Sequence, residues 1–420
     1  MTSENPLEIL FLSPVVPRKE GHGASMRACL NLEALSSEFK VHLVVLSIDD
    51  ANLDIPDEIK DICSSSQTIF VANIAPIKMD SNFSLVREYF RPNARLIREY
   101  PPSLAALIYR NIKSDLQITL IHCFRLCLLD VSVSLGSLLK LPLSSIVLDV
   151  DDFESRAATR TAFANKQKLG NLRYLLDKRE INRICKIEKF ASNNCGQLLL
   201  CSVNDKEGFL EEYPNAKVSV VANGYRFTNA LDSNTSKNTL VFVGSLGYQP
   251  NKDALYYFFS EIWPKLVQLR NSDVQLVVAG RSPPSDIVLL CQQARVTLLE
   301  NPTDIRFAYK DAVALIVPLR MGGGTRIKIL EALGFGRCVI STSIGAEGLD
   351  LVHNEHLLLA DTAVEFAQAC NIILSNPVLS KRLVCAGRTK VRSLYSPDSI
   401  KKQILDAYSR LSLFSDAIGH

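Results

Sequence analysis

A glycine-rich segment, PLRMGGGTRIKILEALGFG, covers residues 318–336. Its glycines follow a short apolar run and precede a helical pattern, so we expect a strand, a loop and a helix. Glycines allow the backbone to approach a ligand closely, and a helix start offers unpaired N–H groups and a positive dipole end. The segment therefore suits a phosphate group or sugar hydroxyls. Its candidate ligand-binding residues are Arg320, Gly322, Gly323, Gly324, Thr325 and Arg326.

Two charged residues of the expected helix add to this chemistry. In a helix from about residue 325 to 335, Gly324, Lys328 and Glu331 follow the spacing i, i+4, i+7 along one face. Lys328 would place a cation beside the phosphates, and Glu331, one turn deeper, would accept hydrogen bonds from a ribose. Arg326 would point away from this face and ranks lower. The alternative interpretation is a glycine-rich turn followed by a solvated, charged helix face.

A second glycine pair, Gly21 and Gly23, flanks His22 between an apolar run and a stretch rich in small residues. One interpretation is a loop that closes over a diphosphate or an acceptor. The other is an ordinary turn between a strand and a helix, which we favour for His22. Arg27, in the first turn of the following helix, could reach a cleft, although we favour its assignment as a surface charge.

Three carboxylates follow one another closely in IVLDVDDF, residues 146–153. They are Asp149, Asp151 and Asp152, at the end of an expected strand. A D-x-D pair in this position could hold a divalent metal ion. The layout of the chain described next does not suit such a site, so no metal is expected.

The histidines and cysteines show no convincing metal-site spacing. His122 ends a strand and is expected in the core or at a cap, whereas His353 and His356 are expected to be solvated. Eleven cysteines are scattered along the chain without a C-x-x-C pair. Most have apolar neighbours, so we expect reduced, buried thiols.

Buried strands must carry these residues, because short apolar runs alternate with longer amphipathic stretches. This alternation predicts parallel sheets flanked by helices, the α/β class. Expected strands are residues 7–12, 41–46, 118–122, 146–149, 197–201 and 218–221, then 239–243, 274–279, 314–317 and 338–341. Expected helices are residues 24–39, 253–269 and 325–335.

A polar stretch after Asn223 and Gly224 separates two such patterns and predicts a domain linker. We expect one Rossmann-like domain over residues 1–225, a second over 226–400, and a last helix and tail over 401–420 that pack back toward the first domain. Ligands of such folds bind beyond the carboxyl ends of the strands. The expected site is therefore the cleft between the two domains.

The bulk composition agrees with a folded, two-domain protein. The chain has 420 residues, of which 47% are hydrophobic and 22% charged, and a formal net charge of +3, which gives no reason to expect nucleic acid as a partner. No signal peptide and no membrane-spanning run is recognisable, so a cytoplasmic protein is expected. Lys and Arg greatly outnumber Asp and Glu over residues 156–189. Two interpretations stay open for this segment: a plain surface helix, or an amphipathic helix that rests on the inner face of a membrane.

The glycine-rich segment resembles the nucleotide-sugar signature of retaining GT-B glycosyltransferases of family four, also called group 1, and most closely that of their polysaccharide-biosynthesis branch. Further similar segments follow in the expected order. They are FLSPVVPRKEGHGASMR (11–27), SVNDKEGF (202–209), VSVVANGYRF (218–227), TLVFVGSLGYQPNKDALYYF (239–258) and VISTSIGAEGLDL (339–351).

The resemblance implies roles for individual residues. Glu331 matches the second glutamate of the family's E-x7-E motif, which holds the ribose, whereas Gly323 stands where the first glutamate is expected. The loop that contains Ser245 and Asn251 would face the diphosphate but lacks the Arg and Lys of family members, and Asn251 occupies the lysine position. Lys328, with Arg320 or Arg326, is expected to supply the missing cation.

The same resemblance implies the reaction. A sugar would pass from a nucleotide-diphosphate sugar to a glycan, a lipid-linked glycan or another acceptor, with retention of configuration and without a metal or other cofactor. Asp151 or, preferably, Asp152 would contact an acceptor hydroxyl or the donor sugar; capping of the next helix is an equal alternative. Alternative functions are an epimerase or phosphorylase of the same fold, or a non-catalytic subunit that binds nucleotide and supports a partner transferase.

Overall fold

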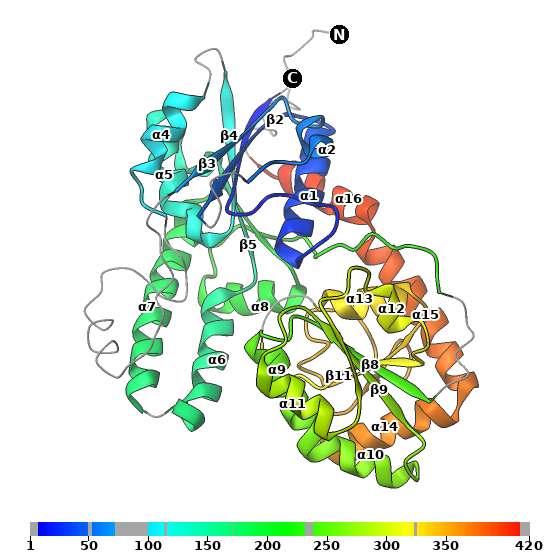
Figure 1. Cartoon of the computed structure of the whole chain (residues 1–420). Coiled ribbons are helices and arrows are strands. Elements are labelled where there is room, and N and C mark those ends of the chain that lie inside the picture. Colours follow the sequence, from blue (N-terminus) through cyan, green and yellow to red (C-terminus); the bar gives the residue numbers. More distant parts are fainter. Residues whose placement is uncertain are drawn as a thin grey trace. The chain divides into compact units, whose positions relative to one another are not determined.

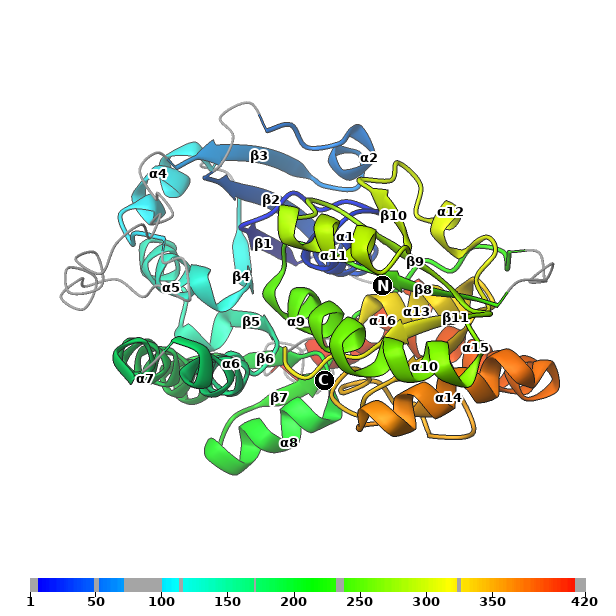
Figure 2. The same ribbon diagram turned by 60° about the horizontal axis from the view of Figure 1, so that its bottom comes forward.

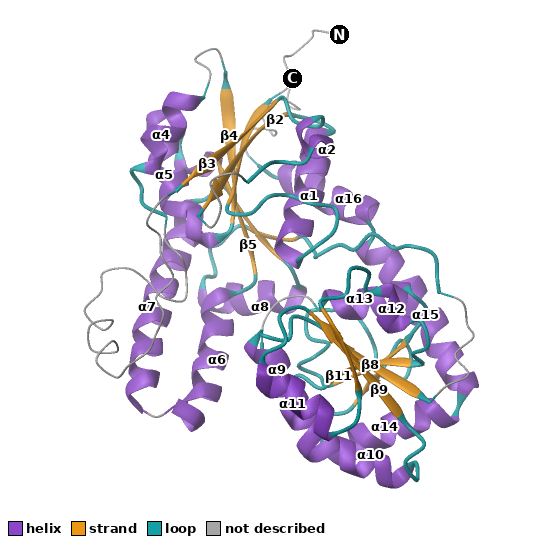
Figure 3. Cartoon of the chain, viewed as in Figure 1, coloured by secondary structure: helices purple, strands orange, loops and turns teal. Residues whose placement is uncertain are grey.

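The computed structural model describes residues 7–48, 53–71, 100–112, 116–169, 171–231, 238–322 and 326–411. Their contacts divide the chain into two compact units (Figure 1). The first consists of residues 1–224 together with 397–420, and the second of residues 225–396. Each unit is built around its own parallel sheet, with helices on both faces (Figure 3).

In the first unit, the described residues form a seven-stranded parallel sheet of order β3-β2-β1-β4-β5-β6-β7. The strands are β1 (Glu8–Ser13), β2 (Lys40–Ser47), β3 (Ser65–Phe70), β4 (Ile118–Phe124), β5 (Ile146–Asp151), β6 (Gln197–Leu200) and β7 (Val218–Val220). The central strands are buried on both faces, which explains their continuous apolar runs.

The second unit repeats this design with six described parallel strands in the order β10-β9-β8-β11-β12-β13. They are β8 (Thr239–Val243), β9 (Gln275–Gly280), β10 (Thr297–Glu300), β11 (Ala314–Val317), β12 (Cys338–Ser341) and β13 (Leu358–Leu359). The order of the strands reverses between β8 and β11, which pair directly. The predicted α/β fold with two parallel sheets is confirmed.

Helices connect these strands as crossover elements. In the first unit they are α1 (Gly23–Ser36), α2 (Asp57–Lys60), α4 (Leu104–Asn111), α5 (Leu129–Leu138), α6 (Glu154–Leu169), α7 (Asn171–Asn194), α8 (Val203–Glu212) and α16 (Pro397–Tyr408). In the second unit they are α9 (Gln249–Tyr257), α10 (Trp263–Leu269), α11 (Ser285–Gln293), α12 (Arg306–Tyr309), α13 (Ile327–Gly334), α14 (Ala363–Ser375) and α15 (Pro377–Tyr395). The last described helix, α16, packs against α1 within the first unit.

Two helices differ from the sequence prediction. The helix expected over residues 253–269 is a run of α9, a π-helical turn over Phe258–Ile262 and α10. The π turn comes just before Pro264, which has no N–H to donate and whose ring crowds the preceding turn. The signature helix α13 begins at Ile327, about two residues later than expected.

The basic segment over residues 156–189 forms most of two paired helices, α6 and α7, which lie side by side (Figure 2). Their paired faces bury Glu188 and Ile184, and Ser155 at the start of α6 donates its N–H to Glu188. Phe163 and Leu175 are exposed. Within the described residues, no helix combines the length and apolarity needed to cross a lipid bilayer.

Candidate active site

The sequence signature of the second unit lies at the carboxyl ends of β8 and β11, where the strand order reverses. Such a reversal point is where open α/β sheets bind their ligands. Gly244 directly follows β8, and a Cβ atom there would lie 2.7 Å from Nδ2 of Asn251 and 3.0 Å from Nζ of Lys328. Only glycine therefore allows these two side chains to approach the end of the strand.

Lys328 lies in the first turn of α13 and its cation has a neutral partner. Its Nζ donates to Oδ1 of Asn251 over 2.9 Å, and Nδ2 of Asn251 donates to the carbonyl of Ser245 over 2.8 Å. The ammonium also lies 4.9 Å from the centre of the Phe242 ring. Burial, followed by the nearby Arg326, lowers the pKa of Lys328 to about 7. Among the described residues, no carboxylate forms an ion pair with this lysine, so an anionic ligand would stabilise its charged form.

Glu331 lies one turn further along α13 and is held by two tyrosines. Its Oε2 accepts from the hydroxyl of Tyr309 over 3.0 Å, and its Oε1 accepts from the hydroxyl of Tyr225 over 3.4 Å. Burial raises the pKa of Glu331 to about 7. Each carboxylate oxygen keeps acceptor capacity beyond its tyrosine, which suits a pair of ligand hydroxyls.

The arginines of the signature loop have different surroundings. Arg320 forms a two-pronged ion pair with the buried Asp253, over 3.0 and 2.9 Å, and stacks over the ring of Tyr257. Arg326 was expected within the helix, on a face turned away from the ligand, but it is not part of α13. It precedes the helix at its N-cap position, is buried, and lies against Gly322, whose φ of +117° favours glycine.

Three further predicted residues, Gly323, Gly324 and Thr325, lie outside the described residues. Of the three residues predicted on one helix face, the described helix α13 carries Lys328 and Glu331. In α9, Lys252 forms an ion pair with Asp286 over 2.8 Å.

In the first unit, Gly21, His22 and Gly23 form the turn that begins α1. His22 is the N-cap residue: its Nδ1 accepts from the N–H of Ser25. Gly21 has a φ of +127° and open space around it, so backbone conformation rather than crowding favours glycine. This geometry agrees with the ordinary strand-to-helix turn that was favoured for His22.

Arg27 is not at the surface, so its assignment as a surface charge is wrong. The side chain is 2% exposed and forms an ion pair with the fully buried Asp149 over 2.8 Å. It also donates to the carbonyl of Val221 and to Oδ1 of Asn223. Asn31, one turn later on α1, donates to the same carboxylate. The missed signal is the low polarity of MRACLNLEAL, in which only Arg27, Asn31 and Glu33 are polar, as is typical of a helix buried on most sides.

The other two carboxylates of this strand end have separate partners. Asp151 pairs with Arg125 over 2.9 Å and accepts from Nδ2 of Asn223 over 2.7 Å. Asp152 accepts from the thiol of Cys201 over 3.3 Å. Burial, followed by the charge of Asp151, raises the pKa of Asp152 to about 7. Two aspartates and Cys201 lie close enough together for a metal ion, yet arginines already balance Asp151.

The histidines give one confirmation and one correction. His122 is fully buried, bonds through Nδ1 to the hydroxyl of Tyr408 over 2.7 Å and stacks on Phe11, as expected of a core histidine. His353 is exposed. His356 was expected to be solvated but is buried, because its Nδ1 accepts from the N–H of Val352 in the loop. Each of the eleven cysteines lies in the described residues as a free thiol, and most are buried.

Residues 237–376 match the model of the family Glycosyl transferases group 1, a third of the chain. The chain also resembles an uncharacterised 44.6 kDa protein in the cps region of Klebsiella pneumoniae, with 28% identity over 137 residues. That match covers 31% of this chain and 35% of the relative, so it spans about a third of the relative's length.

The whole fold is similar to solved glycosyltransferases. HepE of Anabaena, crystallised with UDP, has a TM-score of 0.64 and 13% identity over 96% of this chain and 100% of its own. TarM, known from S. aureus, has a TM-score of 0.65 and 11% identity over 97% and 99%. A glycosyltransferase from Rickettsia africae has a TM-score of 0.59 and 13% identity over 97% and 99%. The chain has the GT-B fold, and residues 237–376 of its second unit match the group 1 model; together these support a glycosyltransferase.

Proposed function

We propose that the protein transfers a glycosyl unit from a nucleotide-diphosphate sugar to a glycan or lipid-linked acceptor, with retention of configuration and without a metal ion. One observation carries the proposal. Lys328 and Glu331 lie one turn apart beyond the end of β8. The lysine has a neutral partner, and the carboxylate has free acceptor capacity. This spacing matches a nucleoside diphosphate, which has a ribose diol next to a doubly charged diphosphate.

In this proposal Glu331 and Lys328 bind different parts of the nucleotide. Glu331 accepts hydrogen bonds from the two ribose hydroxyls, and the hydroxyls of Tyr309 and Tyr225 hold the carboxylate in place. Lys328 lies beside the diphosphate, whose charge grows as the sugar leaves, and stabilises that charge in the transition state. The relatives crystallised with UDP and UDP-glucose support a uridine nucleotide as the first donor to test.

The transfer itself is proposed as a displacement on one face of the sugar. The bond between the anomeric carbon and the leaving phosphate oxygen breaks as the acceptor oxygen approaches from the same side. The proton of the acceptor hydroxyl passes to the leaving phosphate. Asp152 is proposed to bind a sugar or acceptor hydroxyl; its pKa of about 7 lets it act as a donor or an acceptor near neutral pH.

The proposal is tested with a panel of nucleotide-diphosphate sugars against the purified protein in the presence of EDTA, read by thermal shift. One donor should raise the melting temperature selectively, and Glu331→Gln should remove that shift. Stabilisation that requires added Mg²⁺ would contradict the metal-independent mechanism. Stabilisation by no nucleotide would contradict the assignment of the site as a whole.

A second function rests on the absence of the motif's first glutamate, since Gly323 stands in its place. A chain that binds nucleotide but cannot orient the donor sugar would serve as a non-catalytic subunit of another transferase. Turnover by the purified chain alone would exclude this alternative.

A further inference from the structure

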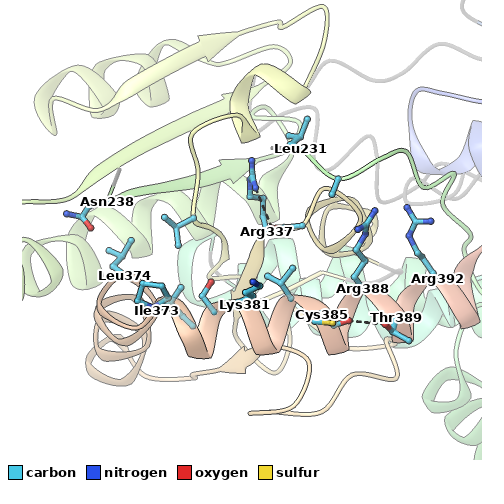
Figure 4. A pocket seen from close by; sticks show the side chains of 16 residues that line it. Leu231, Asn238, Arg337, Ile373, Leu374, Lys381, Cys385, Arg388, Thr389 and Arg392 are labelled. Atoms are coloured by element: carbon cyan, nitrogen blue, oxygen red, sulfur yellow. Dashed lines mark hydrogen bonds between the residues drawn. The ribbon is translucent and has the colours of Figure 1, made fainter. Parts of the chain in front are cut away.

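The second unit contains another cavity, of about 910 Å³, along one side of α15 (Figure 4). Cationic side chains line it: Lys381, Arg388 and Arg392 from α15, and Arg337 from the turn after α13. Among the described lining residues there is no carboxylate. We call this cavity the cation pocket.

Two of these cations are unusually placed. Arg388 and Arg392 lie one helical turn apart and project side by side (Figure 4), an arrangement of like charges that destabilises a helix. Their Nε atoms are both buried and have no hydrogen-bond partner among the described residues. Burial, followed by the charge of Arg388, lowers the pKa of Arg392. An anion between the two guanidinium groups would relieve the repulsion and satisfy the buried N–H groups.

Part of the remaining lining is polar, from Asn238, Ser380 and Thr389, and the larger part is apolar. Leu231, Val313, Ile373, Leu374 and Val384 form this part of the lining. A small inorganic anion would leave their surface exposed to water, whereas an apolar chain would cover it. The pocket therefore suits a ligand with an anionic head and an apolar body.

The pocket is also connected to Glu331 in two ways. Arg337 donates from Nε to the carbonyl of Tyr309 over 2.9 Å, and the hydroxyl of Tyr309 donates to Glu331. Arg392 stacks over the ring of Phe227, 5.4 Å from its centre. Phe227 in turn packs edge-on against Tyr225, the second tyrosine that holds Glu331. Arg337 thus contacts Tyr309, and Arg392 is connected to Tyr225 through Phe227.

We propose that the cation pocket is a binding site for a phosphate monoester with an apolar chain, and that its occupancy strengthens nucleotide binding at Glu331. The ligand's phosphate binds Arg388 and Arg392, and its chain lies on the apolar wall. A phosphate bound to Arg392 fixes this side chain on Phe227, so Tyr225 is already ordered when a nucleotide arrives. The binding of the monoester rests on the pocket alone; the coupling rests on the proposed role of Glu331.

Calorimetry with octyl phosphate as the probe tests the binding. The wild-type chain should bind octyl phosphate, and Arg388→Gln should weaken this binding at least tenfold. The matched control is Arg382→Gln on the same helix, whose side chain donates to the carbonyl of Asn354 and does not line the pocket; it should leave the affinity unchanged. Equal affinity in the Arg388 variant, or no binding by the wild type, would overturn the proposal.

Two further probes separate the parts of the ligand. Inorganic phosphate should bind at least tenfold more weakly than octyl phosphate, and 1-octanol should not compete with it. Equal affinity for inorganic phosphate would overturn the apolar part of the assignment and leave a free phosphate site. Effective competition by octanol would overturn the anionic part. In the wild type, octyl phosphate should also slow alkylation of Cys385, the exposed thiol of the pocket; unchanged alkylation would contradict occupancy even if the variant were unfolded.

The coupling has its own measurement. Saturating octyl phosphate should raise the affinity for UDP about fivefold or more, and UDP should raise the affinity for octyl phosphate by the same factor. Both effects should disappear in Glu331→Gln, which should still bind octyl phosphate. If octyl phosphate binds through Arg388 but the affinity for UDP does not change, the proposed coupling is wrong, whereas the cation pocket is still a binding site for the monoester. If no nucleotide binds at all, the proposed function is wrong. The octyl phosphate titrations still show whether the cation pocket binds a phosphate monoester.

Discussion

The Nζ atom of Lys328 lies 2.9 Å from Oδ1 of Asn251, so the cation at the start of α13 is held by a neutral amide and not by a carboxylate. Asn251 is fixed in turn by its bond to the carbonyl of Ser245. An amide orients the ammonium without neutralising it. The positive charge of Lys328 is therefore available to a ligand, and the first predictions follow from this contact.

Replacing Lys328 by methionine should weaken the binding of a nucleotide-diphosphate sugar by about 30- to 100-fold, since a charge-assisted hydrogen bond contributes about 2 to 3 kcal/mol. Turnover should fall at least as much, because the lysine is proposed to stabilise the leaving group. Isothermal calorimetry and initial rates measure the two effects. Lys252→Met is the control: it removes a lysine of the neighbouring helix that is paired with Asp286. Equal losses in both variants would refute a specific role for Lys328.

Binding of a nucleotide-diphosphate sugar should take up a proton at pH 8. Without a ligand, burial lowers the pKa of Lys328 to about 7, so most of the amine is neutral at pH 8. A bound diphosphate favours the charged form and raises the pKa again. Affinity should accordingly fall as the pH rises from 7 to 9. Calorimetry in buffers of different ionisation enthalpy measures the uptake, which should approach one proton and vanish in Lys328→Met; uptake that persists in the variant would point to another group.

Glu331→Gln should weaken nucleotide binding about tenfold or more. The amide replaces one acceptor oxygen by a donor that faces either Tyr309 or Tyr225, and the ribose hydroxyls lose an ionic acceptor. Tyr309→Phe, which removes only a hydroxyl that orients the carboxylate, should have a smaller effect in the same direction. The affinities of the wild type and the variant for UDP, uridine monophosphate and pyrophosphate show which part of the nucleotide is affected. The affinity for pyrophosphate should be unchanged. A loss for pyrophosphate equal to that for UDP would contradict a ribose contact.

The stability of the protein should depend on His122 below pH 6.5. Burial lowers the pKa of this histidine to about 3, whereas the unfolded chain has an ordinary value of about 6.5. Between these values the unfolded state binds the extra proton, so the histidine's contribution to stability is lost as the pH falls. Because of this histidine, the free energy of unfolding should be about 2 kcal/mol lower at pH 5 than at pH 7. Urea unfolding should give a smaller difference between these two pH values in His122→Phe, and an unaltered difference in the exposed control His353→Gln.

Arg27→Met should destabilise the first unit by about 3 to 5 kcal/mol, because it leaves the buried carboxylate of Asp149 without its cation. The double variant Arg27→Met with Asp149→Leu should recover part of this loss, since both charges of the buried pair are then removed. Lys19→Met, which breaks an exposed ion pair with Glu58, should cost at most about 1 kcal/mol. Urea midpoints compare the three variants. A double variant less stable than Arg27→Met would show that the two side chains do not act as a pair.

Much of this fold could be predicted from the sequence because parallel strands buried on both faces leave a clear record. The runs at β8, β11 and β12 are short, apolar and bounded by glycine or proline, and their predicted bounds agree with the structure. Helix starts were less certain. The described helix α13 begins at Ile327, and periodicity alone could not place Arg326 outside the helix.

The partners of charged residues were the part that could not be predicted. Arg27 and Asp149 are 122 positions apart, and only the three-dimensional arrangement of β5 and α1 brings them together. The tyrosines that hold Glu331 come from the start of the second unit and from α12, with no motif to mark them. Local spacing predicts which residues share a face, whereas contacts between distant segments require the fold itself.

The most direct test of the central claim is the release of nucleoside diphosphate by the purified chain with its stabilising donor, in EDTA, followed by NMR of the sugar product. We expect steady turnover without a metal ion, a product with the same anomeric configuration as the donor, and a loss of at least 30-fold in Lys328→Met. Tight donor binding with no turnover would contradict the central claim and favour the non-catalytic subunit. A product of inverted configuration would contradict the proposed displacement on one face of the sugar.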